Sequence, residues 1–383
     1  MTVTAPAGFR ASGVAAGLKT SGNPDVALVV NDGPADAAAA VFTTNRFPAA
    51  PVQWSRQVLQ SGRLRAVVLN SGGANACTGP EGFGDTHATA EHVAAGLGIG
   101  AIDVAVASTG LIGVRLPMEK LLPGVTEAVG KLSADGGTAA AQAIMTTDTV
   151  PKTTVQRGDG WTIGGMAKGA GMLAPSLATM LVVLTTDAVV DAALLQTALA
   201  SATSVSVERV DSDGCLSTND TVIAMANGAS GVTPDAAEFT AALTAAATDL
   251  AMQLLADAEG STKDIAITVR NAASVADALT AARACARNNL LKTALFGNDP
   301  NWGRVLAAIG TTDAAFAADQ VDVTINGVTV CRGGSIGDPR EGVDLTGRQI
   351  SIDVDFAAGS EQATIWTNDL SLAYVHENSA YST

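Results

Sequence analysis

Residues 168–184 read KGAGMLAPSLATMLVVL, and the two halves of this stretch differ sharply in composition. Glycines and a proline punctuate 168–176, which predicts a loop. The residues from Thr179 to Leu184 are almost all apolar and include two adjacent valines, which indicates a buried strand. We therefore expect a loop that leads directly into the hydrophobic core at Thr179.

Helical and strand patterns alternate on both sides of this stretch. Short apolar runs predict strands at 64–69, 102–107 and 265–269. Apolar residues at helical spacing predict helices at 85–97, 118–132, 139–145, 236–258 and 275–287. Hairpins are expected to join 152–156 to 161–166, 321–325 to 328–330 around Asn326-Gly327, and 350–356 to 362–367. Helices between predicted strands indicate crossover connections, and the hairpins indicate antiparallel pairs. Together they predict a mixed α/β chain.

Length, composition and charge exclude several classes of protein. The chain has 383 residues, which suits about two domains. Hydrophobic residues make up 47% and charged residues 15%, so intrinsic disorder is excluded. The net charge of −15 argues against binding to nucleic acid or anionic membranes. No apolar run approaches a membrane span, and Arg10 and Lys19 interrupt the N-terminal segment, so we expect neither a span nor a signal peptide.

The cysteines and histidines are few and scattered. Cys77, Cys215, Cys285 and Cys331 form no C-x-x-C motif, and the sequence holds only three histidines. This pattern favours free thiols in a reducing compartment over a disulfide framework or a zinc site. We therefore expect a cytoplasmic protein without a bound metal.

Conventional nucleophiles are hard to assign. The glycine-rich segment 70–79 matches no phosphate-binding pattern and predicts a turn. A serine triad lacks its G-x-S-x-G motif, and His87 and His92 lie on a predicted amphipathic helix, which favours packing or surface roles. Cys77 or Cys215 could act as a nucleophile, but neither has an obvious histidine partner.

An N-terminal threonine needs no histidine, because its own α-amine can serve as the base. A free α-amine has a pKa of about 7.7–8.0, so roughly a tenth to a fifth of it is neutral at about pH 7. Such a threonine requires internal cleavage of the chain. Composition alone does not single out any threonine for this role.

Residues 168–181 change this balance, because they closely resemble the self-cleavage motif of the ornithine acetyltransferase (glutamate N-acetyltransferase) family of arginine biosynthesis. Further blocks resemble the same family in the same order along nearly the whole chain. They are AIMTTD at 143–148, DGCLSTNDT at 213–221, KTALFGNDPNWGR at 292–304 and ENSAYST at 377–383.

The resemblance implies a cut between Ala178 and Thr179. The products are an α chain, 1–178, and a β chain, 179–383, that begins with Thr179. Thr179 is then the nucleophile, with its α-amine as base. In the implied ping-pong reaction, Thr179 takes the acetyl group from N-acetyl-L-ornithine and passes it to L-glutamate.

The resemblance also implies the residues around the nucleophile. The oxyanion hole falls on Thr109 and Gly110, in a turn after a predicted strand. The substrate-contacting positions are Thr146, Lys168, Thr179, Glu259, Asn378 and Thr383. Of these, Lys168 suits the substrate α-carboxylate and Glu259 suits the ornithine ammonium group. Asn378 and Thr383 would bring the end of the chain into the site.

By the same resemblance, the fold is a layered αββα sandwich with mixed sheets shared by the α and β chains. The assembly is an (αβ)₂ heterotetramer without a metal or bound organic cofactor. Two departures, Ala170 in place of serine and Cys215-Leu216 in place of a more polar pair, touch neither the nucleophile nor the oxyanion pair. Whether acetyl-CoA also serves as a donor stays open.

Two other classes of function remain open from the sequence. A self-processed aminopeptidase or amidase with an N-terminal threonine would resolve the acyl-enzyme with water instead of glutamate. A non-catalytic small-molecule binding protein would remain one uncut chain.

Overall fold

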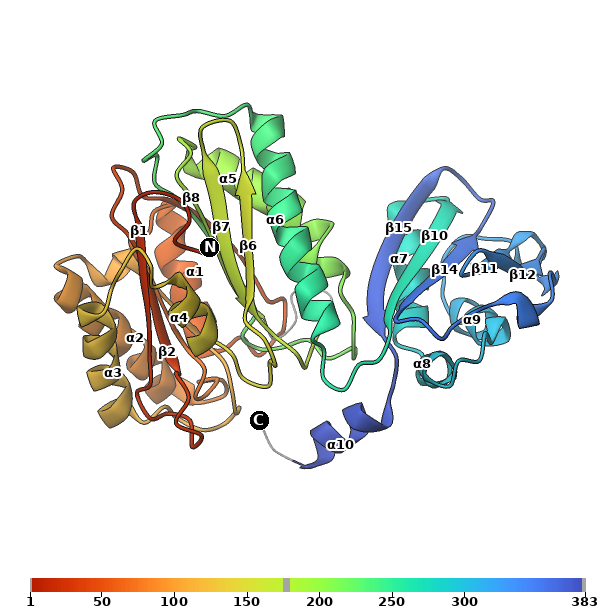
Figure 1. Ribbon diagram of the computed structural model, residues 1–383, viewed down its shortest axis with the longest axis horizontal. Coiled ribbons are helices and arrows are strands. Elements are labelled where there is room, and N and C mark those ends of the chain that lie inside the picture. Colours follow the sequence, from red (N-terminus) through yellow and green to blue (C-terminus); the bar gives the residue numbers. More distant parts are fainter. Residues whose placement is uncertain (1, 175–179, 381–383) are drawn as a thin grey trace.

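The computed structural model describes residues 2–174 and 180–380, which form two lobes with separate hydrophobic cores (Figure 1). The larger lobe stacks two sheets face to face. One sheet has the strand order β1 (Phe9–Val14), β2 (Val26–Asn31), β4 (Ala66–Asn70) and β5 (Val104–Ser108). The other has the order β3 (Ala37–Phe42), β9 (Thr221–Ala226), β8 (Leu181–Thr186), β7 (Thr162–Lys168) and β6 (Lys152–Arg157).

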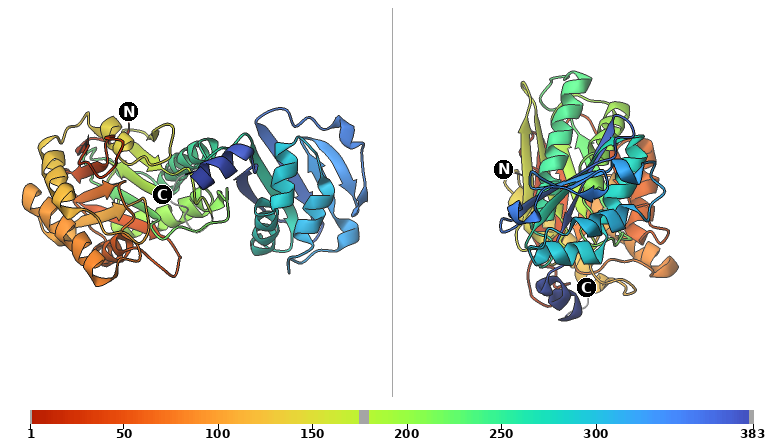
Figure 2. Two further views of the ribbon diagram at one scale, coloured as in Figure 1. Left: turned by 90° about the horizontal axis from the view of Figure 1, so that it is seen from below. Right: turned by 90° about the vertical axis from the view of Figure 1, so that its right-hand side faces the viewer.

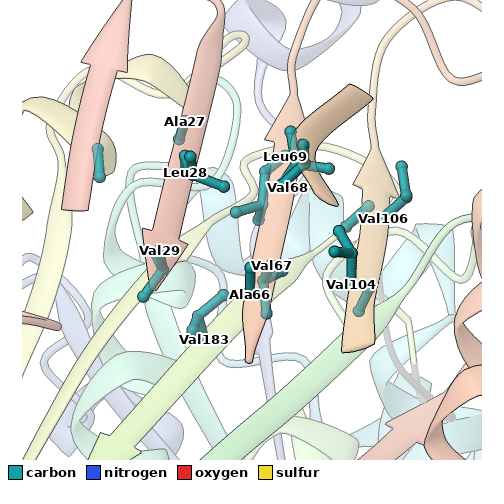
Figure 3. Packing of buried hydrophobic residues seen from close by; sticks show 14 of the residues in the cluster. Ala27, Leu28, Val29, Ala66, Val67, Val68, Leu69, Val104, Val106 and Val183 are labelled. Atoms are coloured by element: carbon teal, nitrogen blue, oxygen red, sulfur yellow. The ribbon is translucent and has the colours of Figure 1, made fainter. Parts of the chain in front are cut away.

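The two sheets share a core built from small and β-branched side chains. Val29 and Val67 of the first sheet and Val183 of the second are almost fully buried in one cluster. Figure 3 shows Val183 directed toward the strands that carry Ala66 and Val29. Because few of these side chains are large, the layers are joined by aliphatic packing with little aromatic contribution.

Helices cover both outer faces of the stacked sheets. The first sheet contacts α1 (Ala50–Val58), α2 (Gly79–Leu97), α3 (Met118–Gly130) and α4 (Gly137–Ala143). The second contacts α5 (Ala192–Ser204) and α6 (Ala236–Ala256). Both sheets mix parallel and antiparallel pairs. The expected αββα sandwich with mixed sheets is thus confirmed.

Strands from both sides of residue 178 lie next to each other in the second sheet. Strand β7, which precedes this position, pairs antiparallel with β8, which follows it. Strand β8 also pairs parallel with β9. Segments from both sides of residue 178 therefore contribute to one continuous sheet.

Helix α6 packs on strands β6 and β7 of the second sheet. Its first turn is capped by Asp235, whose side chain accepts hydrogen bonds from the Ala237 and Glu238 amides. It ends at Ala256, two residues before the predicted end, and Gly260 beyond it has a φ of +59°. By length and composition α6 could cross a membrane, but Phe239 and Leu250 on it are fully buried against the larger lobe, as in a core helix.

The smaller lobe contains a third sheet that the sequence analysis does not anticipate as a separate layer. Its strand order is β13 (Ser335–Ile336), β12 (Val328–Arg332), β11 (Asp322–Ile325), β14 (Gln349–Asp355), β10 (Asp264–Ala272) and β15 (Glu361–Asn368). The helices of this lobe are α7 (Val275–Ala286), α8 (Asn289–Phe296) and α9 (Trp302–Ile309). The chain then leaves the lobe through α10 (Leu372–Ala380), which lies below the two lobes in Figure 1 and between them in the left view of Figure 2.

Two of the three predicted hairpins are confirmed, and one is wrong. Strands β6 and β7 pair directly, as do β11 and β12 around Asn326-Gly327, where both residues have positive φ. Strands β14 and β15 exist near the predicted positions, but β10 lies between them and pairs with both. Strands that are neighbours in the sequence often pair as a hairpin. Here, however, one edge of β10 pairs with β14 and the other edge pairs with β15, so β14 and β15 do not pair with each other.

Candidate active site

One cavity brings together predicted site residues from five separate parts of the chain. Six of the predicted site residues that the structure describes line it: Thr109, Gly110, Thr146, Lys168, Glu259 and Asn378. They come from the turn after β5, the segment before β6, the end of β7, the segment after α6, and α10. The tertiary fold therefore brings these predicted residues together.

The turn after β5 is held rigidly by its backbone. The Thr109 amide donates to the Asn70 carbonyl oxygen at 2.9 Å, and the Thr109 carbonyl oxygen accepts from the Gly73 amide at 3.0 Å. Gly110 has a φ of +130°, and a Cβ atom there would lie 2.8 Å from the Gly73 nitrogen. Only glycine suits this position. The glycine-rich segment 70–79 thus acts as the platform on which this turn packs.

Asn219, which precedes β9 of the second sheet, holds the same turn through two hydrogen bonds. Its Nδ2 donates to the Ala74 carbonyl oxygen at 2.6 Å and to the Ser108 carbonyl oxygen at 2.8 Å. Asn219 also lines the cavity. The sequence analysis quoted this residue within 213–221 but assigned it no role.

Lys168 reaches the hydroxyl group of the turn. It is the last residue of β7, is 2% exposed, and its Nζ donates to Thr109 Oγ1 at 3.3 Å. Because Oγ1 accepts this hydrogen bond, the Thr109 hydroxyl proton is directed elsewhere and can be donated to a ligand oxygen. Burial lowers the pKa of Lys168, while the charge of Asp148 opposes that shift.

Asp148 holds two segments of the cavity wall at once. Its Oδ2 accepts from the Thr146 amide at 2.9 Å, and its Oδ1 accepts from the Gly169 amide at 2.6 Å and from Lys152 Nζ at 2.7 Å. Burial alone would raise the pKa of Asp148, but Lys168 and Lys152 outweigh it and lower the pKa to about 2. Asp148 is therefore a buried carboxylate that ties Thr146 to the end of β7.

This carboxylate belongs to a buried network that the sequence analysis missed. Lys152 is fully buried and also donates to Asp257 Oδ2 at 2.6 Å. Asp257 accepts in turn from the Thr149 amide at 2.9 Å. The sequence does contain a hint of this network, because the block 143–148 ends in the acidic residue Asp148. Nothing in the sequence, however, indicates that Asp148 or Asp257 pairs with Lys152.

Glu259 connects the end of α6 to α10 on the other side of the cavity. Its Oε1 accepts from Thr147 Oγ1 at 2.8 Å, and its Oε2 accepts from Asn378 Nδ2 at 3.0 Å. Its amide donates to the Ala170 carbonyl oxygen at 3.0 Å. A carboxylate so placed can bind an ammonium group that enters the cavity.

Three predicted positions, Ala178, Thr179 and Thr383, lie outside the described residues. Near the first two, Ala174 and Met180 are both fully buried, and the Met180 amide donates to Asp220 Oδ1 at 3.1 Å. The last described element, α10, carries Asn378 to the cavity.

The described lining of this cavity includes neither histidine nor cysteine. His87 packs near the Trp54 ring, and His92 contacts Thr126 Oγ1 at 2.7 Å on the outer helices. The packing and surface roles expected of these histidines are therefore confirmed. Cys77 and Cys215 are exposed and have free thiols, as expected.

Comparison with known proteins gives consistent matches over the whole chain. The family model described as "ArgJ family" matches residues 10–383. A protein of Thermobifida fusca (strain YX) is 63% identical over 383 residues, which is 100% of both chains. One of Streptomyces avermitilis is 64% identical over 382 residues, again 100% of both. Both are named "Arginine biosynthesis bifunctional protein ArgJ".

A solved structure is also similar in sequence. It is an ornithine acetyltransferase complexed with ornithine from Mycobacterium tuberculosis, 63% identical over 47% of this chain and 96% of that chain, with a TM-score of 0.45.

Proposed function

The chain belongs to the ArgJ family of acetyltransferases of arginine biosynthesis, and on that premise we propose that it transfers the acetyl group of N-acetyl-L-ornithine to L-glutamate after cutting its own Ala178–Thr179 bond. The observation that supports the proposal most is the single cavity lined by six residues of the family pattern. These residues lie far apart in the sequence. Their presence around one cavity is what a shared active site requires.

Self-cleavage comes first in this proposal. The Thr179 hydroxyl attacks the Ala178 carbonyl carbon, the acyl group moves from nitrogen to oxygen, and water then hydrolyses the ester. A free α-amine has a reference pKa of about 7.7–8.0, so the α-amine that cleavage frees on Thr179 would provide a base for catalysis near neutral pH.

The acetyl group then passes through an acetyl-threonine intermediate. Thr179 Oγ attacks the acetyl carbonyl of N-acetyl-L-ornithine, and ornithine leaves with a proton from the α-amine. The amine of L-glutamate attacks the acetyl-enzyme in the second half-reaction. Each half-reaction passes through a tetrahedral oxyanion, which the Thr109 hydroxyl and the Gly110 amide would stabilise by several kcal/mol.

The charges around the cavity suit two amino-acid substrates. Glu259 would bind the side-chain ammonium group of ornithine, and Lys168 would provide positive charge for a carboxylate. Asn378 holds Glu259 through its amide group at 3.0 Å and so would orient that carboxylate. Thr383, which lies outside the described residues, would add a further contact to the substrate.

The proposal includes the assembly and location that the family pattern implies. The two cleaved chains would remain joined through the shared sheet and associate as an (αβ)₂ heterotetramer in the cytoplasm. The relatives are named bifunctional, which favours a second activity for this chain as well. We propose that this activity is the acetylation of L-glutamate with acetyl-CoA as the acetyl donor.

Intact-mass spectrometry tests this function directly. We expect two fragments that correspond to 1–178 and 179–383, and an acetyl adduct on the second fragment after incubation with N-acetyl-L-ornithine. Glutamate should remove the adduct and yield N-acetyl-L-glutamate. The Thr179→Ala variant should remain one inactive chain, whereas Thr197→Ala, on the surface of α5, should be cut and active.

Two outcomes would overturn the proposal. Normal cleavage of Thr179→Ala would exclude this nucleophile. Fast hydrolysis of the acetyl adduct without glutamate-dependent turnover would instead support the aminopeptidase or amidase alternative. Adduct formation with acetyl-CoA alone would establish the second donor.

A further inference from the structure

A second cavity lies where the two lobes meet, and it is separate from the active-site cavity. Its walls come from residues 212–213 of the larger lobe, from the end of α7 and the start of α8, and from residues 369–374. Among the described residues, none lines both cavities. The second cavity has a volume of about 60 Å³, against about 80 Å³ for the first. A water molecule needs about 10–15 Å³ of such space, so a small organic molecule fits.

Lys292 provides a buried positive charge at this second cavity. It begins the block 292–304, which has no role in the proposed function. It is 5% exposed, and its Nζ donates to the Ser212 carbonyl oxygen and to Thr367 Oγ1, the latter at 3.0 Å. A lysine ammonium group has three protons, so one remains available within the described part of the chain. Burial lowers the pKa of Lys292 to about 8, while nearby aspartates oppose the shift, so the group stays mostly charged at about pH 7.

Arg287 adds a second positive charge to the same wall. Its Nε donates to Asp211 Oδ2 at 2.8 Å, which is the only hydrogen bond of its guanidinium group to residues that the structure describes. The two terminal nitrogens therefore keep their four N–H donors for a ligand. Arg287 and Lys292 together form a side of the cavity that can bind a carboxylate.

The cavity also has a negative side, formed by Asp213 and Asp369. The Asp369 carboxylate is occupied, because it accepts from the Thr262 and Lys263 amides at 2.9 Å and from the Thr262 hydroxyl group. Asp213 Oδ1 accepts from the Cys215 amide at 3.0 Å. Burial raises the pKa of Asp213, and backbone amides bound to it oppose that shift. Asp213 is therefore the carboxyl group whose charge a cationic ligand would stabilise.

These charges select for a ligand that carries both signs. A simple anion would be attracted by Lys292 and Arg287 but repelled by Asp213, and a simple cation would meet the reverse. From this arrangement we infer that the cavity is a second binding site for a free α-amino acid, whose carboxylate binds Lys292 and Arg287 and whose ammonium group binds Asp213. Binding there makes and breaks no covalent bond, so the inference is independent of the self-cleavage and acetyl transfer proposed above.

Isothermal titration calorimetry of the full chain tests the ligand class. L-Alanine is the probe, because it carries both charges of an amino acid but no charged side chain for Glu259 to bind. Acetate and methylammonium each carry one of the two charges. We expect L-alanine to bind at least about 10-fold more tightly than either, since each charge-assisted hydrogen bond contributes to affinity. Equal affinity for acetate would show that the site takes any small anion and would overturn the assignment.

Substitutions on the two sides of the cavity locate the binding. Arg287→Gln should weaken L-alanine binding by about 10- to 100-fold. Arg283→Gln is the matched control, because Arg283 lies one turn earlier on α7 and does not line this cavity. Asp213→Asn should weaken the binding of L-alanine and strengthen that of acetate, because the repelling charge is removed. Glu259→Gln, in the active-site cavity, should leave the affinity for L-alanine unchanged.

Lys292→Met should also abolish binding, and thermal melting without ligand shows whether each variant folds. If Lys292→Met does not fold, the half-exposed Arg287 decides. No binding of L-alanine to the original chain would overturn the inference, as would an unchanged affinity in both Arg287→Gln and Asp213→Asn. A failure of the proposed function would instead appear as an uncut chain or a lack of acetyl transfer, neither of which alters these affinities.

Discussion

Lys168 Nζ lies 3.3 Å from Thr109 Oγ1 and joins the two stacked sheets at the floor of the cavity. Lys168 ends β7 of one sheet, and Thr109 follows β5 of the other. Both side chains are almost fully buried, so little water screens this contact. This hydrogen bond uses the hydroxyl oxygen as an acceptor and leaves the hydroxyl proton for a ligand oxygen.

Replacement of Thr109 by valine should therefore slow catalysis without a comparable loss of stability. Valine has nearly the same shape but cannot donate a hydrogen bond to an oxyanion. We expect kcat to fall by about 10²- to 10³-fold, measured with saturating N-acetyl-L-ornithine and L-glutamate. Thr109→Ser, which keeps the hydroxyl group, should retain most of the activity. Equal activity of the Val and Ser variants would contradict the donor role.

The Gly110 position should tolerate no side chain. In Gly110→Ala the new Cβ would approach the Gly73 nitrogen to 2.8 Å and force the turn to move. We expect kcat to fall by about 10²-fold or more, since an oxyanion donor would be displaced. Gly113→Ala is the control, because Gly113 also has a positive φ but no atom lies within 4 Å of its added Cβ. A similar loss in both variants would point to backbone strain instead of crowding.

Glu259→Gln should weaken the binding of one substrate selectively. The amide is isosteric with the carboxylate but lacks the charge that an ornithine ammonium group requires. We expect KM for N-acetyl-L-ornithine to rise by about 10- to 100-fold, with a smaller change for L-glutamate, which has no side-chain ammonium. Steady-state kinetics with each substrate varied in turn measures the difference. Equal changes for both substrates would argue for a general structural role.

Asp148→Asn should destabilise the protein in a pH-dependent way. The pKa of Asp148 is about 2 in the folded chain and about 3.9 when unfolded, so its carboxylate contributes about 2 kcal/mol at neutral pH. Because the folded pKa is the lower one, this contribution is complete above about pH 5 and is lost as the pH falls from there through about 2.

Urea unfolding at several pH values checks this expectation. The stability difference between the original chain and Asp148→Asn should shrink as the pH falls from about 5 toward 2. The exposed Asp135→Asn should show little difference at any pH. A difference for Asp148→Asn that does not change with pH would show that its charge is not what stabilises the network.

The wrong hairpin shows where local patterns stop being informative. Asn326-Gly327 marks its turn by residue type, because both residues adopt positive φ, and the predicted pairing is correct. No such signal lies between β14 and β15, and β10, which precedes them by many residues, inserts between them. Alternating apolar residues identify a strand but do not identify its partners.

The sequence by itself predicted a mixed α/β chain and a loop over 168–176, and the resemblance of its blocks to a known family implied the αββα sandwich and the residues expected to act together. Tertiary structure alone decided that Thr109, Lys168 and Glu259 meet in one cavity, that Asp148 and Lys152 hold its wall, and that Asp220 faces the Met180 amide. The physical reason is that these contacts depend on strand register and sheet stacking, which join residues with no spacing rule in the chain.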